Sequence, residues 1–133
     1  MIVADTNLIA YLLIEGQRSR QAERAFGRDP EWAAPLLWRS EFRNVLAYYV
    51  RARMLSLDAS IRIVDAGESL MRDREYAMES AQILHLASRS SCSAYDCEFV
   101  ALAQELGVKL VTSDRTILRK FPGSAVSLDA FAA

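Results

Sequence analysis

The chain has 133 residues, of which 52% are hydrophobic and 25% are charged, and its net charge is −1. This size and composition suit one globular domain and exclude a disordered chain, and the net charge argues against a wholly basic nucleic-acid-binding surface without excluding RNA. No apolar run approaches the roughly 20 residues of a membrane-spanning helix, and the N-terminus lacks the pattern of a signal peptide. We therefore expect a single cytoplasmic domain over residues 1–133, with no membrane partner.

The first half of the chain begins with a short apolar strand and continues mainly as helices. Residues 2–4 predict a buried strand that ends at Asp5. The expected helices cover residues 8–14, 17–27, 40–54 and 57–74. The clearest is 40–54, because its apolar residues recur every three to four positions along one face. Residues 32–37 predict a second strand or an extended segment, and Pro35 weakens the strand prediction.

The second half alternates helices with short apolar strands. The expected helices cover residues 78–90, 94–106 and 115–121. Gly107 follows the second of these helices, where a left-handed residue commonly ends a helix. The segments 108–112 and 125–128 are typical of strands. Because short apolar strands alternate with helices, the sequence predicts an α/β fold with a short, mainly parallel sheet between layers of helices.

Four acidic residues stand where such a fold gathers the ends of its strands. Asp5 directly follows the first strand, and Asp114 follows the penultimate one. Glu41 and Asp96 each lie in the first turn of a predicted helix. Ligands bind beyond the carboxyl ends of the strands in an open parallel sheet. We therefore expect all four acids to point into the same end of the fold.

Each acid also has an explanation that involves no chemistry. Asp96 has the spacing of a helix cap with Ser93. Glu41 and Asp114 lie where carboxylates complement helix dipoles, and Asp5 fits a turn. Taken together, however, grouped carboxylates repel one another, and a protein tolerates them mainly around a cation. Because oxygen ligands favour hard divalent ions, the four acids predict a site for Mg²⁺ or Mn²⁺.

The four acids lie within four short motifs. These are IVADTN at residues 2–7, SEFRNVL at 40–46, AYDCEFVALA at 94–103 and LVTSD at 110–114. In order and approximate spacing they resemble the motifs of PIN-domain nucleases, and most of all those of VapC-type toxins from prokaryotic toxin–antitoxin pairs. Cys97 stands where this family commonly has a small alanine. The resemblance spans nearly the whole chain and implies a PIN-like three-layer α/β/α sandwich.

The resemblance also implies a metal-dependent endoribonuclease that cuts single-stranded or loop RNA. Asp5, Asp96 and Asp114 would hold one or two Mg²⁺ or Mn²⁺ ions, and Glu41 would complete the catalytic cluster. The metal would activate a water and stabilise charge on the scissile phosphate, leaving a 5′-phosphate and a 3′-hydroxyl. As a toxin of a type II pair, the chain would have a cognate antitoxin and would form a homodimer. Apolar residues within 8–14 and 48–55 are candidates for the antitoxin groove.

Polar, basic and aromatic residues near the acids are secondary candidates. The short polar residues would orient a carboxylate, a water or a phosphate, unless they serve only turns and helix caps. They are Thr6, Asn7, Thr112 and Ser113. Arg43 and Arg115 would contact RNA phosphates, with solvated surface arginines as the alternative. Tyr48 and Tyr49 are expected in the core or at an interface rather than stacked on bases.

Two other functions compete with this hypothesis. A haloacid-dehalogenase-like phosphatase also places an aspartate after its first strand, but it needs a second aspartate two residues later, where this chain has Asn7. A PIN-like module that binds RNA or protein without cutting is the alternative from another class. The presence of all four acids counts against it. Binding of Mg²⁺ or Mn²⁺ that is weakened by Asp96→Asn would favour the nuclease.

Overall fold

The computed structural model describes residues 1–133, and its centre is a five-stranded sheet in which every neighbouring pair of strands is parallel. The strands are β1 (Ile2–Ala4), β2 (Trp32–Pro35), β3 (Glu75–Tyr76), β4 (Leu110–Thr112) and β5 (Ala125–Ser127). Their order across the sheet is β3-β2-β1-β4-β5. The central strand β1 is apolar and fully buried, as expected for a parallel strand covered on both faces.

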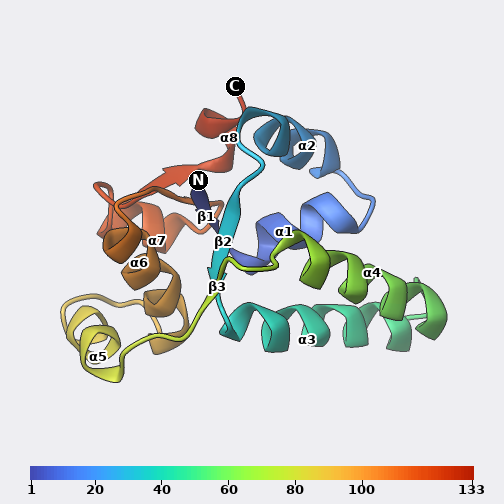
Figure 1. Cartoon of the computed structure of the whole chain (residues 1–133), viewed down its shortest axis with the longest axis horizontal. Helices are drawn as coiled ribbons and strands as arrows, with labels where there is room; N and C mark the ends of the chain where they lie inside the picture. The colour runs from blue at the N-terminus through green and yellow to red at the C-terminus, as the bar shows by residue number, and fades with distance from the viewer.

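Helices cover both faces of this sheet. They are α1 (Thr6–Leu13), α2 (Ser19–Arg28), α3 (Leu37–Arg51), α4 (Leu57–Leu70), α5 (Ser80–Ser88), α6 (Ala94–Leu106), α7 (Arg115–Lys120) and α8 (Leu128–Phe131). Figure 1 shows α5 and α6 on one side of the strands and α1, α3 and α4 on the other. The predicted three-layer α/β/α arrangement is therefore confirmed. No helix combines the length and the apolar composition that a membrane crossing requires.

One apolar core joins the layers and fixes the direction of α3. It contains 29 buried residues, and Trp32 and Trp38 are among its largest fully buried side chains. The Trp38 indole donates a hydrogen bond to the Glu75 carboxylate at 2.7 Å, and Arg39 binds the same carboxylate through Nε at 2.7 Å and Nη2 at 2.8 Å. These bonds fasten the short edge strand β3 to the first turn of α3, the helix that carries Glu41.

The sequence prediction located the main elements and erred mostly at their ends. Helix α6 has the predicted bounds, and Gly107 ends it with a left-handed φ of 67°. Pro35 is the last residue of β2 and lies beyond Trp32 and Ala33, which pair with β1. Its missing N–H therefore does not interrupt the pairing of β1 and β2. Helix α3 begins at Leu37, three residues earlier than predicted. Glu41 therefore lies in the second turn of its helix and not in the first.

Two short elements were absent from the prediction. Helix α4 ends at Leu70 and is followed by a turn in which Asp73 has a φ of 66°. The chain then forms the two-residue strand β3. Near the C-terminus, Ser127 ends β5 and its hydroxyl accepts a hydrogen bond from the Ala130 N–H at 3.1 Å. That cap starts the one-turn helix α8 where the sequence predicted the last residue of a strand.

Candidate active site

Asp5 stands at the centre of the site because it directly follows the central strand and caps helix α1. Its Oδ1 accepts a hydrogen bond from the Leu8 N–H at 2.8 Å, and its Oδ2 accepts one from the Thr112 hydroxyl. Burial raises the pKa of Asp5 to about 6, outweighing these two hydrogen bonds, and the nearby carboxylates of Asp114 and Glu41 add to the rise. The fold therefore buries the Asp5 carboxyl group where its hydrogen bonds do not offset the cost of ionising it.

Thr112 joins the ends of the two middle strands. It lies at the end of β4, which pairs with β1 in the register Ala4 to Val111. Its hydroxyl donates to Asp5 and accepts a hydrogen bond from the Asp114 N–H at 3.0 Å. Asp114 in turn caps α7, because its Oδ1 accepts from the Ile117 N–H at 2.9 Å. The predicted supporting role of Thr112 thus has a geometric basis in two contacts.

The other two acids come from helices on opposite faces of the sheet. Glu41 lies on α3, and its Oε1 accepts a hydrogen bond from the Thr6 hydroxyl at 2.7 Å. Asp96 lies in the first turn of α6, a helix that Ser93 caps by accepting from the Asp96 N–H at 3.1 Å. Burial and the neighbouring Asp114 carboxylate raise the pKa of Asp96. Asp96 is therefore close to Asp114 as well as part of a helix start.

All four acids line one pocket of about 270 Å³ at the carboxyl ends of β1 and β4. The sequence also predicted two of the other lining residues, Thr6 and Asn7. No lysine or arginine lines the pocket. Convergence of the acids agrees with the sequence prediction, while their catalytic roles stay predictions. The remaining lining residues are Asn44, Val45, Phe99 and Ile117.

The donor set of this pocket suits a hard divalent ion. Four carboxylates line one pocket, and no basic side chain lines it with them. Burial raises the pKa of Asp5 and of Asp96. A bound cation would lower both pKa values again. No three of the acids lie close enough together to hold an ion without further ligands. Mg²⁺ commonly binds through one or two carboxylates and keeps several waters. The pocket therefore fits an ion that retains much of its hydration.

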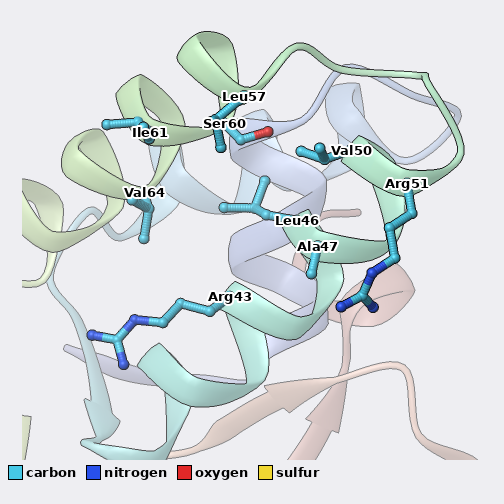
Figure 2. Close-up of a pocket in the computed structure, with 9 residues that line it drawn as sticks. All are labelled: Arg43, Leu46, Ala47, Val50, Arg51, Leu57, Ser60, Ile61 and Val64. Atoms are coloured by element: carbon cyan, nitrogen blue, oxygen red, sulfur yellow. The ribbon is translucent and has the colours of Figure 1, made fainter.

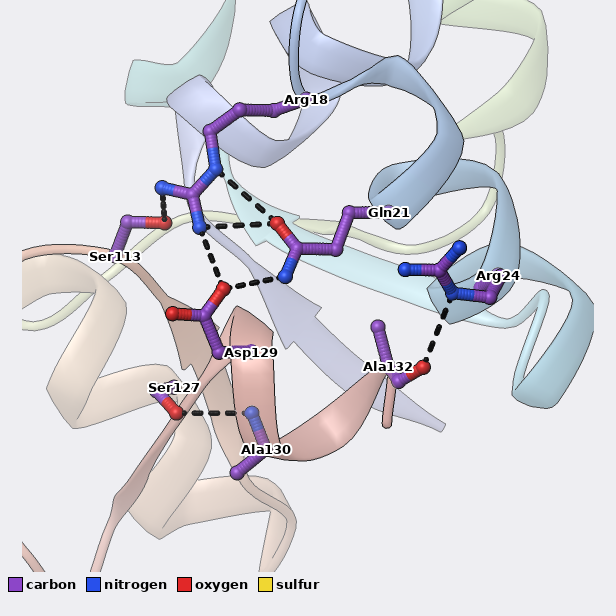
Figure 3. A network of polar contacts seen from close by, with 8 residues as sticks. All are labelled: Arg18, Gln21, Arg24, Ser113, Ser127, Asp129, Ala130 and Ala132. Atoms are coloured by element: carbon purple, nitrogen blue, oxygen red, sulfur yellow. Dashed lines mark hydrogen bonds and ion pairs between the residues drawn. The ribbon is translucent and has the colours of Figure 1, made fainter.

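Ser113 and Arg115 lie beside the pocket rather than in it. The Ser113 hydroxyl accepts a hydrogen bond from Nη1 of Arg18 at 2.9 Å, and Arg18 also contacts Asp129 at 3.0 Å (Figure 3). Ser113 and Arg115 line a separate small pocket that does not include Asp114. Because successive residues of an extended segment face opposite sides, Ser113 points away from the acids, while Arg115 begins helix α7. The structure thus does not support the proposed contact of Ser113 with the acidic pocket.

Arg43 faces away from the acids, against our expectation that it would reach RNA at their pocket. Residues two positions apart lie about 200° apart around a helix, so Arg43 and Glu41 occupy opposite faces of α3. Figure 2 shows Arg43 and Arg51 beside apolar side chains of α3 and α4. We call this surface the α3–α4 groove, and its apolar lining consists of Leu46, Ala47, Val50, Leu57, Ile61 and Val64.

Two residues that contribute to the neighbourhood of the acids were not predicted from the sequence. Asn44 lines the acidic pocket because it lies three positions after Glu41, on the same face of α3. That spacing was visible in the sequence. Arg18 precedes α2 and holds the turn at Ser113, 95 residues away, and no local pattern indicates such a contact.

Comparison with known proteins establishes the family of this chain. The model of the PIN domain family matches residues 2–122. Ribonuclease VapC3 from Pyrobaculum aerophilum is 34% identical over 124 residues, which cover 91% of this chain and 95% of that protein. The chain therefore belongs to the PIN-domain family, and the resemblance to VapC-type proteins that the motifs indicated is confirmed.

Two solved structures have the same fold at low sequence identity. The first, a toxin–antitoxin complex from Klebsiella pneumoniae, is 20% identical with a TM-score of 0.71, covering 96% of this chain and 98% of that one. FitAcB from Neisseria gonorrhoeae is 16% identical with a TM-score of 0.76, again covering 96% and 98%. These similarities extend over the complete three-layer sandwich.

Proposed function

We propose that this chain is a Mg²⁺- or Mn²⁺-dependent endoribonuclease that cuts single-stranded or loop RNA and acts as the toxin of a type II toxin–antitoxin pair. The convergence of the four acids on one pocket carries this proposal. The 34% identity to a protein named Ribonuclease VapC3 supports RNA as the substrate. The cytoplasm, where RNA is available, is the proposed location.

Asp5, Asp96 and Asp114 are the residues that would hold the metal, directly or through its bound waters. Asp114 uses only Oδ1 for its helix cap, and Asp96 lines the same pocket from the first turn of α6. Bound there, Mg²⁺ or Mn²⁺ would supply an activated water and stabilise charge on the scissile phosphate. Thr112 keeps Asp5 and Asp114 at a fixed separation, which preorganises the ligands.

Glu41 and Asn7 would act on the other side of the same pocket. Thr6 occupies one oxygen of Glu41 and leaves the second free to accept a hydrogen bond from a water. Asn7 lines the pocket and its side chain makes no hydrogen bond within the protein, so its amide is available to a phosphate oxygen. We therefore assign Glu41 to orienting the attacking water and Asn7 to orienting the substrate.

Cleavage of total cellular RNA by the purified protein tests this function. We expect discrete fragments with Mg²⁺ or Mn²⁺, none with EDTA, and none from Asp96→Asn. Glu105→Gln is the matched control, because Glu105 is an exposed acid on the same helix and lies outside the pocket. Equal cutting by Asp96→Asn would contradict the assignment. RNA binding without cutting in any sample would favour a non-catalytic module.

The α3–α4 groove is the surface that we propose for the antitoxin; it includes Val50 and Arg51 of the predicted segment 48–55 but no residue of the predicted segment 8–14. Leu57 is 64% exposed and Ile61 48% exposed, and clustered apolar side chains on a surface commonly mark a protein interface. Arg43 and Arg51 border the apolar lining. An amphipathic helix would pack its apolar face against this lining, and acidic residues flanking that face would pair with the two arginines. The Klebsiella protein of the same fold was solved as a toxin–antitoxin complex, which supports a partner of this kind.

Inhibition of RNA cleavage by the cognate antitoxin tests this surface. Ile61→Asp should cut RNA normally but escape inhibition, because it places a like charge opposite the acidic flank and removes apolar contact. Inhibition equal to that of the wild-type protein would place the antitoxin elsewhere. We also propose that the chain forms a homodimer, which sedimentation of the purified protein would test.

A further inference from the structure

We propose that a second pocket, beside the acidic one, binds a nucleobase of the RNA next to the cleaved bond. Resting on the proposed ribonuclease function, this inference assigns part of the substrate specificity to Tyr49 and Gln17. The pocket lies between α1, the segment that follows it, and α3. We call it the tyrosine pocket, because Tyr11 and Tyr49 both line it.

The tyrosine pocket adjoins the acidic pocket. Asn7 and Val45 line both pockets. The volume of the tyrosine pocket is about 350 Å³, within the range of roughly 300–1,000 Å³ of small-ligand sites. An RNA chain with its scissile phosphate at the acids would therefore bring an adjacent base to the tyrosine pocket.

The aromatic side chains of this pocket are held in place by neighbours. The guanidinium of Arg18 lies 5.3 Å from the centroid of the Tyr11 ring. The Tyr49 ring packs edge to face with Tyr48 at a centroid distance of 5.7 Å and an interplanar angle of 81°. Single-stranded RNA is recognised mainly by stacking unpaired bases on such rings. Tyr49 lines the pocket from α3 and is half-buried, which leaves part of its ring available for stacking.

The polar groups of the pocket suit the edge of a base better than a phosphate or an acidic peptide. Arg18 is the only basic residue that lines it, and this arginine is already paired with Asp129 at 3.0 Å. Gln17 is exposed, makes no hydrogen bond within the protein, and offers both a donor and an acceptor. The two arginines of the α3–α4 groove, by contrast, provide the positive charge that an acidic partner needs.

Cleavage of an RNA oligonucleotide with single bases removed tests this inference. The oligonucleotide spans a cut site mapped with wild-type protein, and each base near the cut is replaced in turn by an abasic nucleotide. We expect one abasic position to lower kcat/KM of the wild-type protein about 5- to 150-fold, as loss of one stacked base does. Tyr49→Leu should lose a similar factor on intact RNA and be insensitive to that abasic position. Tyr49→Phe, which keeps the ring, should behave like the wild-type protein.

The ratio of intact to abasic cleavage separates base binding from a general defect. If Tyr49→Leu is merely less well folded, its kcat/KM falls for both substrates and the wild-type ratio persists, which overturns the inference. A Gln17→Ala variant should accept more bases at the same position, measured by sequencing the cut ends of a randomised substrate. An unchanged base preference in both variants also overturns the inference and leaves the pocket to a protein partner. Absence of any cutting by the wild-type protein overturns the proposed function and this inference with it.

Discussion

Helix α3 contributes to two surfaces of opposite character, the acidic pocket and the α3–α4 groove. At the acidic pocket, hydrogen bonds from Thr6, Thr112 and backbone N–H groups hold the carboxylates in place. In the groove, apolar side chains such as Ile61 are open to solvent and have no polar restraint. A single helix thus presents a preorganised chemical site on one face and an uncovered apolar surface on the other. Residues of α3 only two positions apart therefore lie on different surfaces.

The largest effect is expected from Asp5→Asn. Asparagine keeps the shape of the side chain and the helix cap but removes the charge that would hold the metal. We expect the cleavage rate to fall at least about 100-fold. In the groove, Ile61→Asp should change the rate of the free enzyme by no more than about twofold, as is typical of surface substitutions. If both variants lost a comparable fraction of the cleavage rate on the same RNA substrate, the acidic pocket and the groove would not differ in their contribution to cleavage.

The stability of the metal-free protein should fall as the pH rises from about 4 to about 6. Asp5 has a pKa of about 6 in the folded protein, above its ordinary value of 3.8. The folded state therefore binds more protons than the unfolded chain in this window, and the free energy of unfolding decreases by about 3 kcal/mol before it levels off.

Urea denaturation of the wild-type protein and Asp5→Asn across this pH range measures the effect. The variant should lack most of the decrease, because its side chain does not ionise. Mg²⁺ added at pH 7 should recover stability in the wild-type protein only. A decrease of equal size in the variant would assign the pH dependence to other groups.

A smaller effect is expected from Thr112→Val, which removes a hydroxyl while keeping the branched shape. Oδ2 of Asp5 loses its hydrogen-bond donor, and the Asp114 N–H loses its acceptor. We expect activity to fall about 10- to 100-fold, as for other residues that orient metal ligands, with a stability loss of about 1–3 kcal/mol. Thr116→Val on α7 is the control, since Thr116 makes no side-chain hydrogen bond. Unaltered Mg²⁺ affinity in Thr112→Val would contradict the positioning role.

The smallest effects concern two arginines. Arg43→Ala should change RNA cleavage by less than about twofold, because Arg43 faces the groove. Arg115 lies beside Asp114 and is expected to contact a phosphate, so Arg115→Ala should reduce the salt dependence of RNA binding by about one phosphate contact. Binding measured at several salt concentrations compares the two variants. A larger salt effect for Arg43→Ala would place the RNA over the opposite face of α3.

The residues that sequence predicted well are those whose position follows from chain order. Asp5 and Asp114 follow apolar strands, and parallel strands end at one edge of their sheet, so their convergence was predictable. Asp96 followed from the helix start at Ser93. Arg43 was predicted beside the acids because it is close to Glu41 in sequence. The prediction did not consider that residues two positions apart point to opposite sides of a helix.

What the sequence did not indicate depends on contacts between distant segments. Strand β3 is only two residues long and has no alternating pattern, so it exists through pairing with β2 and through the Arg39–Glu75 bonds. Arg18 reaches Ser113 only after α2 and β4 have packed. Tyr49, expected in the core or at an interface, lines a pocket beside the acids because α1 ends opposite it.

The hydrogen bond between Thr112 and Asp5 joins residues 107 positions apart, and β1 has β4 as a neighbour. During synthesis, β1 therefore has no β4 partner until most of the chain has left the ribosome. Such long-range parallel pairing also forms slowly. Nascent or truncated chains that carry Asp5 and Glu41 but lack β4 should consequently be unable to cleave ribosomal RNA. The topology therefore keeps the acidic cluster unassembled until the segment that carries Asp96 and Asp114 has been made.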